Sequence, residues 1–302
     1  MAAGPGKLFL AVGEVMVELS GDGPGLWREG VAGDTYNTAC HARRALPADW
    51  RVGYFTRLGT DPFSDRIAAA AEARGLETGF IARDPSRRPG LYAIALKDGE
   101  RSFTYWRDRS AARLLADDEG ALSAAFGQAA CIHVSGITLA ILAPDRRAAL
   151  IAAMARARDA GAAVVFDGNI RPALWEDAAA MRAALTAAAG AASIALPSFD
   201  DEAAAFGDAD IHATAARLHA AGAREVVVKN GGGTVLVSGP DGAAELSDLP
   251  KVTPVDTTGA GDSFNGAFLA ARLTGAGAEE AVRAGHACAS AVVLHKGALP
   301  PL

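Results

Sequence analysis

Residues 254–268 read PVDTTGAGDSFNGAF, and this stretch holds the clearest chemical signal in the chain. Gly259-Ala260-Gly261 can turn successive backbone N–H groups toward one point. A helix that begins near Asp262 adds its free N–H groups and its dipole, so the stretch predicts an anion site with a carboxylate beside it. Phosphoryl transfer to an alcohol needs this pair, because a base takes the hydroxyl proton while donors hold the transferring group. The alternative is a glycine-rich turn in which Asp262 only caps the helix.

The chain on either side of this motif alternates strand-like and helix-like segments. Short β-branched runs predict strands, and stretches of helical period predict helices. Strands are expected at 8–19, 51–58, 131–136, 162–167, 193–196 and 225–230, and helices at 34–46, 61–75, 144–160, 176–190, 200–206, 210–222, 260–274 and 278–294. Repeated βα units predict an α/β fold with a mostly parallel sheet covered by helices. Ligands bind beyond the carboxyl ends of such strands, which singles out 167–169 and 229–231.

Two segments do not fit this layered pattern. Residues 15–32 and 88–108 read as hairpins, the second with Lys97-Asp98-Gly99-Glu100 at its turn. We expect them to form a small separate sheet, and a further hairpin from 234 to an Asp-Gly turn at 241–242. The hairpin at 90–107 is too short for a core of its own. Its exposed edge predicts pairing with 15–32 or with a second chain, and hence a homo-oligomer.

Composition argues against several classes of protein. The chain has 302 residues, half of them hydrophobic, and a net charge of −6 without basic runs, which argues against a nucleic-acid partner. Cys40, Cys131 and Cys288 lie far apart, so we expect reduced thiols in the cytoplasm rather than a zinc site or disulfides. The longest uncharged stretch, 183–198, is too short to span a membrane, and no signal-peptide pattern is visible.

The string DTTGAGD at 256–262 resembles the C-terminal signature of the ribokinase/PfkB carbohydrate kinases, and the resemblance extends over essentially the whole chain. It implies a ribokinase-like three-layer α/β sandwich, with residues 1–302 as a single domain and a small β-sheet lid from about 15–32 and 88–108. It also implies ATP and Mg²⁺, with Asp262 as general base and Gly259, Ala260 and Gly261 as the anion hole for the γ-phosphate. The motif is neither a Walker A loop nor a dinucleotide fingerprint.

Further motifs resemble the 2-keto-3-deoxygluconate kinases within that family. They are GEVMVEL (13–19), GDT (33–35), PGLY (89–92), YWR (105–107), SGITLA (135–140) and FDGNIRP (166–172). The resemblance implies phosphorylation of the terminal C6 hydroxyl of 2-keto-3-deoxygluconate. That substrate is an acid, and Arg107 and Arg171 can hold a carboxylate through paired, planar hydrogen bonds.

The resemblance also assigns residues to the ligands. Substrate contacts are implied for Gly33, Asp34, Asn37, Tyr92, Tyr105, Arg107 and Arg171. ATP contacts are implied for Asn169, Arg171, Lys229, Gly231, Gly233 and Thr234, together with the anion hole. Potassium is implied at Asp256 and Thr258, and magnesium near Asp201. The chain departs from the family at Ala32-Gly33, which replaces Gly-Gly, and at 198–201, where Ser and Asp replace the Asn and Glu of a magnesium motif. Magnesium is therefore expected to be held mainly through water and the ATP phosphates.

Other interpretations stay open at this point. Relatives in the family phosphorylate other sugars, such as fructose, ribose or tagatose 6-phosphate. The galactonate-derived ketoacid differs from the gluconate-derived one only at a single hydroxyl. A non-catalytic sugar sensor is the alternative from a different class, and it would need neither Asp262 nor an intact anion hole.

Overall fold

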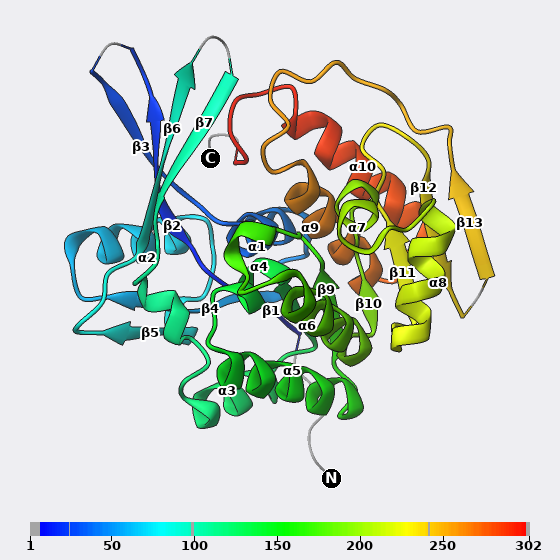
Figure 1. Ribbon diagram of the computed structural model, residues 1–302, viewed down its shortest axis with the longest axis horizontal. Helices are drawn as coiled ribbons and strands as arrows, with labels where there is room; N and C mark the ends of the chain where they lie inside the picture. The colour runs from blue at the N-terminus through cyan, green and yellow to red at the C-terminus, as the bar shows by residue number, and fades with distance from the viewer. Residues whose placement is uncertain (1–6, 24, 98–99, 241, 300–302) are drawn as a thin grey trace.

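The computed structural model describes residues 7–23, 25–97, 100–240 and 242–299. Figure 1 shows a large sheet with helices on both faces and a smaller sheet that stands away from one end of it. The expected turn at 98–99 and the first residue of the turn at 241–242 lie outside the described residues. The predicted α/β class, with a mostly parallel sheet and a second small sheet, is confirmed.

The large sheet has the strand order β13-β12-β11-β10-β9-β8-β1-β4-β5. Its strands are β1 (Leu8–Val12), β4 (Arg51–Gly59), β5 (Ile81–Asp84), β8 (Cys131–Ser135), β9 (Ala163–Asp167), β10 (Ile194–Ala195), β11 (Glu225–Val228), β12 (Val235–Gly239) and β13 (Gly242–Leu246). Neighbours pair in parallel from β5 to β11, and β12 and β13 add an antiparallel hairpin at one edge.

Helices cover both faces of this sheet. They are α1 (Asp34–Ala45), α2 (Pro62–Ala73), α3 (Glu119–Phe126), α4 (Gly136–Ala140), α5 (Pro144–Asp159), α6 (Ala178–Ala191), α7 (Phe199–Phe206), α8 (Ile211–Ala221), α9 (Ala260–Leu273) and α10 (Ala278–Val292), with short 3₁₀ turns at Thr78–Phe80, Ala111–Leu114 and Pro172–Leu174. In the described residues no helix is long and apolar enough to cross a membrane.

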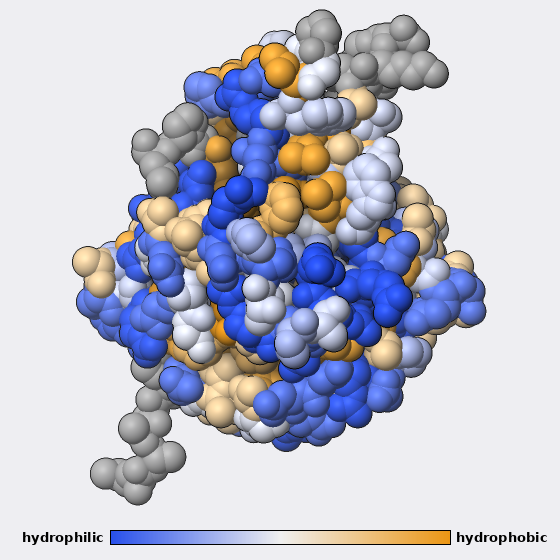
Figure 2. All heavy atoms as spheres, turned by 90° about the vertical axis from the view of Figure 1, so that its left-hand side faces the viewer, coloured by the Kyte–Doolittle hydropathy of each residue, from blue (hydrophilic) through white to orange (hydrophobic). Residues whose placement is uncertain are grey.

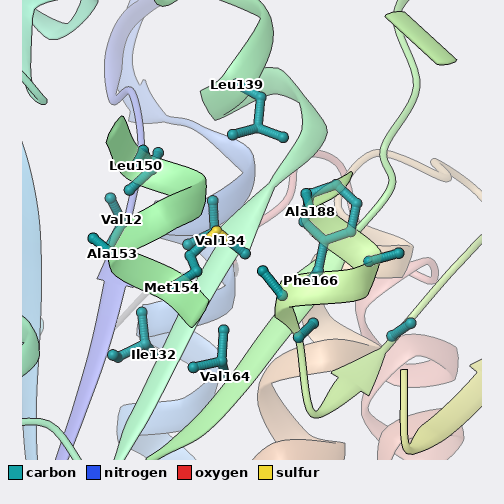
Figure 3. Close-up of a cluster of buried hydrophobic side chains, with 14 of the residues drawn as sticks. Val12, Ile132, Val134, Leu139, Leu150, Ala153, Met154, Val164, Phe166 and Ala188 are labelled. Atoms are coloured by element: carbon teal, nitrogen blue, oxygen red, sulfur yellow. The ribbon is translucent and has the colours of Figure 1, made fainter. Parts of the chain in front are cut away.

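Alternating side chains of each strand supply two separate cores. Leu8, Leu10 and Val12 of β1 pack with helices α3 to α6 and α8, whereas Phe9 and Ala11 pack with α1, α2, α9 and α10. Figure 3 shows part of the first core, where side chains of the central strands meet α4, α5 and α6. Because both faces are buried, the strands are nearly continuous apolar runs, which is typical of parallel sheets.

The smaller sheet, called the lid below, has the order β3-β2-β6-β7. Its strands are β2 (Met16–Gly21), β3 (Trp27–Ala32), β6 (Gly90–Lys97) and β7 (Glu100–Trp106). The expectation of one strand over 8–19 was wrong, because the chain leaves the large sheet at Gly13 and enters the lid at Met16. A Cβ on Gly13 would lie 2.3 Å from Thr35 Oγ1, so the crossing chain passes too close to α1 for any larger residue.

Candidate active site

The predicted site residues meet at the carboxyl ends of the central strands, where two helices begin. β9 ends at Asp167, and Lys229 follows β11 directly. On one face of the sheet α1 begins at Asp34 and α9 at Ala260, and the two helices pack against each other. Segments that are far apart in the sequence therefore form one site, as the open α/β sheet predicts.

Asp262 lies in the first turn of α9, at the centre of this site. Its Oδ2 accepts a hydrogen bond of 2.8 Å from the side-chain amide of Asn37 on α1. Burial and, next in size, the charge of Asp34 raise the pKa of Asp262 from an ordinary 3.8 to about 8. The Asn37 hydrogen bond and the charge of Lys229 act in the opposite direction. A carboxyl group with a pKa near neutrality is suited to take a proton from a hydroxyl group.

A buried ammonium group lies next to residues 259–261, called the anion loop below. Lys229 Nζ donates to Asn265 Oδ1 at 3.0 Å and to Asp167 Oδ1 at 3.3 Å. Asn265 donates to the other oxygen of Asp167 at 2.8 Å. A Cβ placed on Gly261 would lie 3.7 Å from Lys229 Nζ. The site therefore places a positive charge beside the backbone of the anion loop.

Gly259 sets the shape of the anion loop. It is the N-cap of α9 and has a φ of 75°, a left-handed conformation that favours glycine. A Cβ there would also lie 2.4 Å from the Cβ of Ala298. Asp256 fixes the same region, because its carboxylate accepts hydrogen bonds from the backbone amides of Thr258 at 2.9 Å and Gly297 at 2.7 Å. The anion loop is thus tied to residues 293–299, called the C-terminal loop below.

The start of α1 forms the opposite wall of the site. Asp34 is the first residue of the helix rather than its cap, which is Gly33. Asp34 Oδ2 accepts a hydrogen bond of 2.7 Å from the side-chain amide of Asn169. Asn169 has a φ of 32°, the only positive value at a non-glycine position in the described residues. Where the family has its first glycine, Ala32 packs in the lid against Met16.

The lid presents aromatic and charged side chains to the site. Tyr92 donates a hydrogen bond to Glu18, and its ring centre lies 5.7 Å from that of Tyr105. Burial and the charge of Glu18 raise the pKa of Tyr92, and Asp262 contributes to the shift, so this face of the lid faces the site. Arg107 forms a buried ion pair with Glu14 at the base of the lid. Tyr105 is half exposed.

Arg171 and Asp201 lie together at the rim. Arg171 Nη1 donates to Asp201 Oδ2 at 3.2 Å, and the Asp201 carboxylate also accepts from the backbone amide of Ile170 at 3.2 Å. The Arg171 side chain is 52% exposed, in contrast to Arg107 at 8%. The remaining predicted ATP residues, Gly231, Gly233 and Thr234, lie in the turn between β11 and β12.

The comparison with known proteins gives the family. Residues 7–302 match the pfkB family carbohydrate kinases. The chain belongs to this family. The resemblance that the 256–262 signature indicates is thereby confirmed, and the ribokinase-like fold is confirmed with it.

Two curated relatives and one solved structure add detail to this membership. The 2-dehydro-3-deoxygluconokinase of Dickeya dadantii is 41% identical over 304 residues, and that of Escherichia coli K12 is 39% identical over 302 residues. Each alignment covers 98% of this chain and 97% of the relative. A putative ribokinase II from E. coli, solved in complex with ATP and Mg²⁺, superposes with a TM-score of 0.82 at 25% identity, over 97% of this chain and 94% of that one.

In this pfkB family kinase the structure adds partners that the sequence reasoning missed. Glu14 and Glu18 hold Arg107 and Tyr92, and Asp167 and Asn265 hold Lys229. Signals for some of them were present. Glu14 and Glu18 are two carboxylates, four residues apart, in an otherwise apolar run, and Asn265 lies three residues after Asp262, on a neighbouring part of the same helix face.

Proposed function

We propose that this kinase transfers the γ-phosphoryl group of ATP to the terminal C6 hydroxyl of 2-keto-3-deoxygluconate, giving 2-keto-3-deoxy-6-phosphogluconate. The observation that carries the proposal is the carboxyl group of Asp262, whose pKa is raised to about 8 beside the anion loop. Relatives named 2-dehydro-3-deoxygluconokinase, at 39% and 41% identity over nearly their whole lengths, support this choice of acceptor.

The chemistry divides between Asp262 and the anion loop. Asp262 takes the proton of the C6 hydroxyl while that oxygen bonds to the γ-phosphorus. The bond between the γ-phosphorus and the β–γ bridging oxygen breaks, and ADP leaves. Backbone amides of Gly259, Ala260 and Gly261, with the positive end of α9, stabilise the charge on the transferring group. Lys229 has three N–H donors and uses two on Asp167 and Asn265, which leaves one for a phosphoryl oxygen.

We place the ketoacid between the start of α1 and the lid. Asp34 and Asn37 are positioned to bond its hydroxyls, and Gly33 allows close approach of the backbone. Tyr92 and Tyr105 cover the opposite side. For the carboxylate, Arg171 is favoured by its half-exposed guanidinium, whereas Arg107 already has Glu14 as a partner and would contribute its remaining donors.

ATP is proposed to lie along the carboxyl ends of β9 and β11. Asn169, Arg171, Lys229 and the turn with Gly231, Gly233 and Thr234 would contact it. In the described residues no group of three or more His, Cys, Asp or Glu side chains could hold a metal ion. Magnesium would therefore be held by the ATP phosphates and water, with Asp201 as the nearby carboxylate, and would neutralise phosphate charge.

A monovalent-cation site at Asp256 and Thr258 is a separate part of the proposal. What supports it is that Asp256 is 5% exposed and joins the anion loop to the C-terminal loop, so a cation there would act directly on the anion loop. Rates measured in K⁺, Na⁺ and Li⁺ at equal ionic strength test it. Stimulation by K⁺ alone supports the site, and equal rates in all three salts remove it.

A coupled ADP-release assay over a panel of acceptors tests the proposed activity. The panel contains 2-keto-3-deoxygluconate, 2-keto-3-deoxygalactonate, fructose, ribose and tagatose 6-phosphate, with the Asp262→Asn variant as the matched control. We expect the highest kcat/KM with the gluconate-derived ketoacid and loss of that activity in the variant. A higher kcat/KM with a neutral ketose would assign another acceptor, and sugar binding without turnover would favour the sensor.

We also propose a homodimer, or an assembly of dimers, formed through the lid. Strand alternation places Leu91, Ala93 and Trp106 on the face opposite Tyr92 and Tyr105. Figure 2 looks at the side of the molecule that carries the lid, and apolar side chains gather on the upper part of this face. Trp106 is 59% exposed. Leu91 and Ala93 are already packed within the protein, so a second copy would cover Trp106, in the closed, two-fold arrangement that is commonest among oligomers.

Sedimentation of a Trp106→Asp variant tests the dimer, with Phe103→Asp on the inner face as the matched control. We expect the first to weaken association and the second to affect the ketoacid KM. The side chain of Leu96, in the same hairpin, lies outside those that the structure describes. A wild-type protein that sediments as a monomer at assay concentrations removes the dimer and leaves the kinase activity untouched.

The compartment that we propose is the cytoplasm. Cys40, Cys131 and Cys288 are free thiols in the structure, which suits a reducing environment. Cell fractionation with an antibody to the chain would test it, and recovery from an oxidising compartment would contradict it.

A further inference from the structure

His41 connects α1 to the C-terminal loop behind the anion loop. It lies on α1 and its side chain is only 4% exposed. Its Nε2 is 3.0 Å from the backbone oxygen of Ala298, and its Nδ1 is 3.7 Å from Cys288 Sγ on α10. The imidazole therefore links α1 to two other segments, the C-terminal loop and α10.

The partners of His41 define its tautomer. The Ala298 oxygen can only accept, so Nε2 carries the proton and donates it. Nδ1 is then the acceptor and faces the thiol of Cys288, which is a weak donor. Burial lowers the pKa of His41 and raises that of Cys288, so both groups are neutral near pH 7 and keep these roles.

The residue that His41 holds packs directly against the anion loop. Ala298 leaves no room for a side chain at Gly259, since a Cβ there would lie 2.4 Å from the Ala298 Cβ. The neighbouring amide of Gly297 donates a hydrogen bond to Asp256, three residues before the anion loop. A displacement of Ala298 would therefore remove a packing contact of Gly259, which is the first residue of the anion loop.

The same face of α1 also holds the base. Asn37 and His41 are four residues apart, so they lie one above the other on one face of the helix. Asn37 bonds Asp262 at 2.8 Å, and His41 bonds Ala298 at 3.0 Å. The helix is seated closely on α9, because a Cβ on Gly266 would lie 2.7 Å from the Cβ of His41. One face of α1 thus contacts both Asp262, the proposed general base, and Ala298, which packs against the anion loop.

We propose that His41 is a positioning residue for phosphoryl transfer. Its Nε2–H···O bond to Ala298 holds the C-terminal loop against Gly259, and this contact keeps the backbone of the anion loop in its position relative to Asp262. The role rests on the phosphoryl-transfer site proposed above. It predicts an effect on kcat rather than on ketoacid binding, because the bond supports the group that holds the transferring phosphoryl.

Two amide variants separate this bond from general packing. The amide nitrogen of His41→Gln reaches about as far from the backbone as Nε2, so it can still donate to Ala298. In His41→Asn the amide ends near the position of Nδ1, so it can face Cys288 but not reach Ala298. Cys288→Ala is the matched control for the other side of the ring. We expect kcat to fall about tenfold or more in His41→Asn, with the ketoacid KM nearly unchanged, and to stay within about threefold in His41→Gln and Cys288→Ala.

A second measurement does not depend on activity. Lys296 lies exposed in the C-terminal loop, and limited digestion with trypsin, followed by intact-mass spectrometry, reports release of the segment after it. We expect faster cleavage at Lys296 in His41→Asn than in the wild type or His41→Gln, at temperatures where circular dichroism shows all proteins folded. Equal cleavage and kcat in the two amide variants, or a rise in ketoacid KM at constant kcat, would overturn the role of His41. Absence of wild-type turnover on the ketoacid would instead refute the proposed substrate, while the cleavage comparison still decides about His41.

Discussion

Replacing Asp262 with asparagine should raise stability at alkaline pH while it removes most of the activity. The variant keeps the shape of the side chain and its contact with Asn37, but it cannot ionise. Loss of a general base typically lowers a rate by about 10²- to 10⁴-fold. The effect on stability follows from the pKa of Asp262, which burial and the charge of Asp34 raise to about 8 from 3.8.

The sign and size of the stability effect can be worked out from that shift. The unfolded chain ionises Asp262 near pH 4, whereas the folded chain keeps it protonated until about pH 8, so the contribution of this group to stability is lost as pH rises between these values. Each pKa unit corresponds to about 1.4 kcal/mol, which sets a ceiling of about 4 kcal/mol between about pH 5 and pH 8. The side chain is partly exposed, and solvent screening reduces the expected change to about 1–3 kcal/mol.

Thermal melts of both proteins at about pH 5 and pH 8 measure this difference, because every other titrating group is common to the two chains. From about pH 5 to about pH 8, the melting temperature of the variant should rise by about 2–6 °C relative to that of the wild type. The raised pKa of Asp262 would be refuted if the difference in melting temperature between the two proteins stayed constant, or if it shifted in favour of the wild type as pH rises. A kcat within about threefold of wild type would remove Asp262 from the role of base.

Three further changes address other parts of the site. Arg171→Ala should raise the ketoacid KM about tenfold or more, because a charge-assisted bond contributes about 1.5–3 kcal/mol; steady-state kinetics in which only the ATP KM moves would assign Arg171 to the nucleotide. Gly259→Ala should lower the free energy of unfolding by about 1–3 kcal/mol and abolish turnover, because of the φ of 75° and the contact with Ala298; an unchanged melt and rate would contradict this. Glu14→Gln should destabilise by about 3–5 kcal/mol, since it leaves Arg107 buried without a counter-charge. Adding Arg107→Met should recover most of that loss, and a double variant no more stable than Glu14→Gln would count against the ion pair.

The sequence predicts the layered fold well because its strands are buried on both faces. All residues from Leu8 to Val12 are buried, and such a run has no other plausible place than the centre of a parallel sheet. The same logic fails a few residues later. The run continues to Leu19, interrupted only by Gly13, Glu14 and Glu18, and the pattern does not show that the chain changes sheets at Gly13, where it passes close to Thr35.

The site is predictable where one local motif holds its parts together and not where the fold joins distant segments. The anion loop and Asp262 are adjacent in sequence, so a single stretch indicates both. The ion pair of Glu14 and Arg107 spans 93 positions, and no local pattern connects them. For Lys229 the sequence singles out the segment after a buried strand, but the hydrogen bond of Lys229 to Asn265 depends on how α9 is placed over β11.

The junction between the lid and α1 bears on how acceptor preference can change in this chain. β3 ends at Ala32 and α1 begins at Asp34, with Gly33 between them. A Cβ on Gly33 would lie 2.2 Å from the backbone oxygen of Glu14, where the chain enters β2. The entry and exit of the β2–β3 hairpin therefore touch beside Asp34 and Asn37, the residues that we propose bind the sugar hydroxyls. Grafting this hairpin alone from a relative would also reset the first turn of α1, so hairpin and helix, residues 13–45, form the smallest piece that can be exchanged intact.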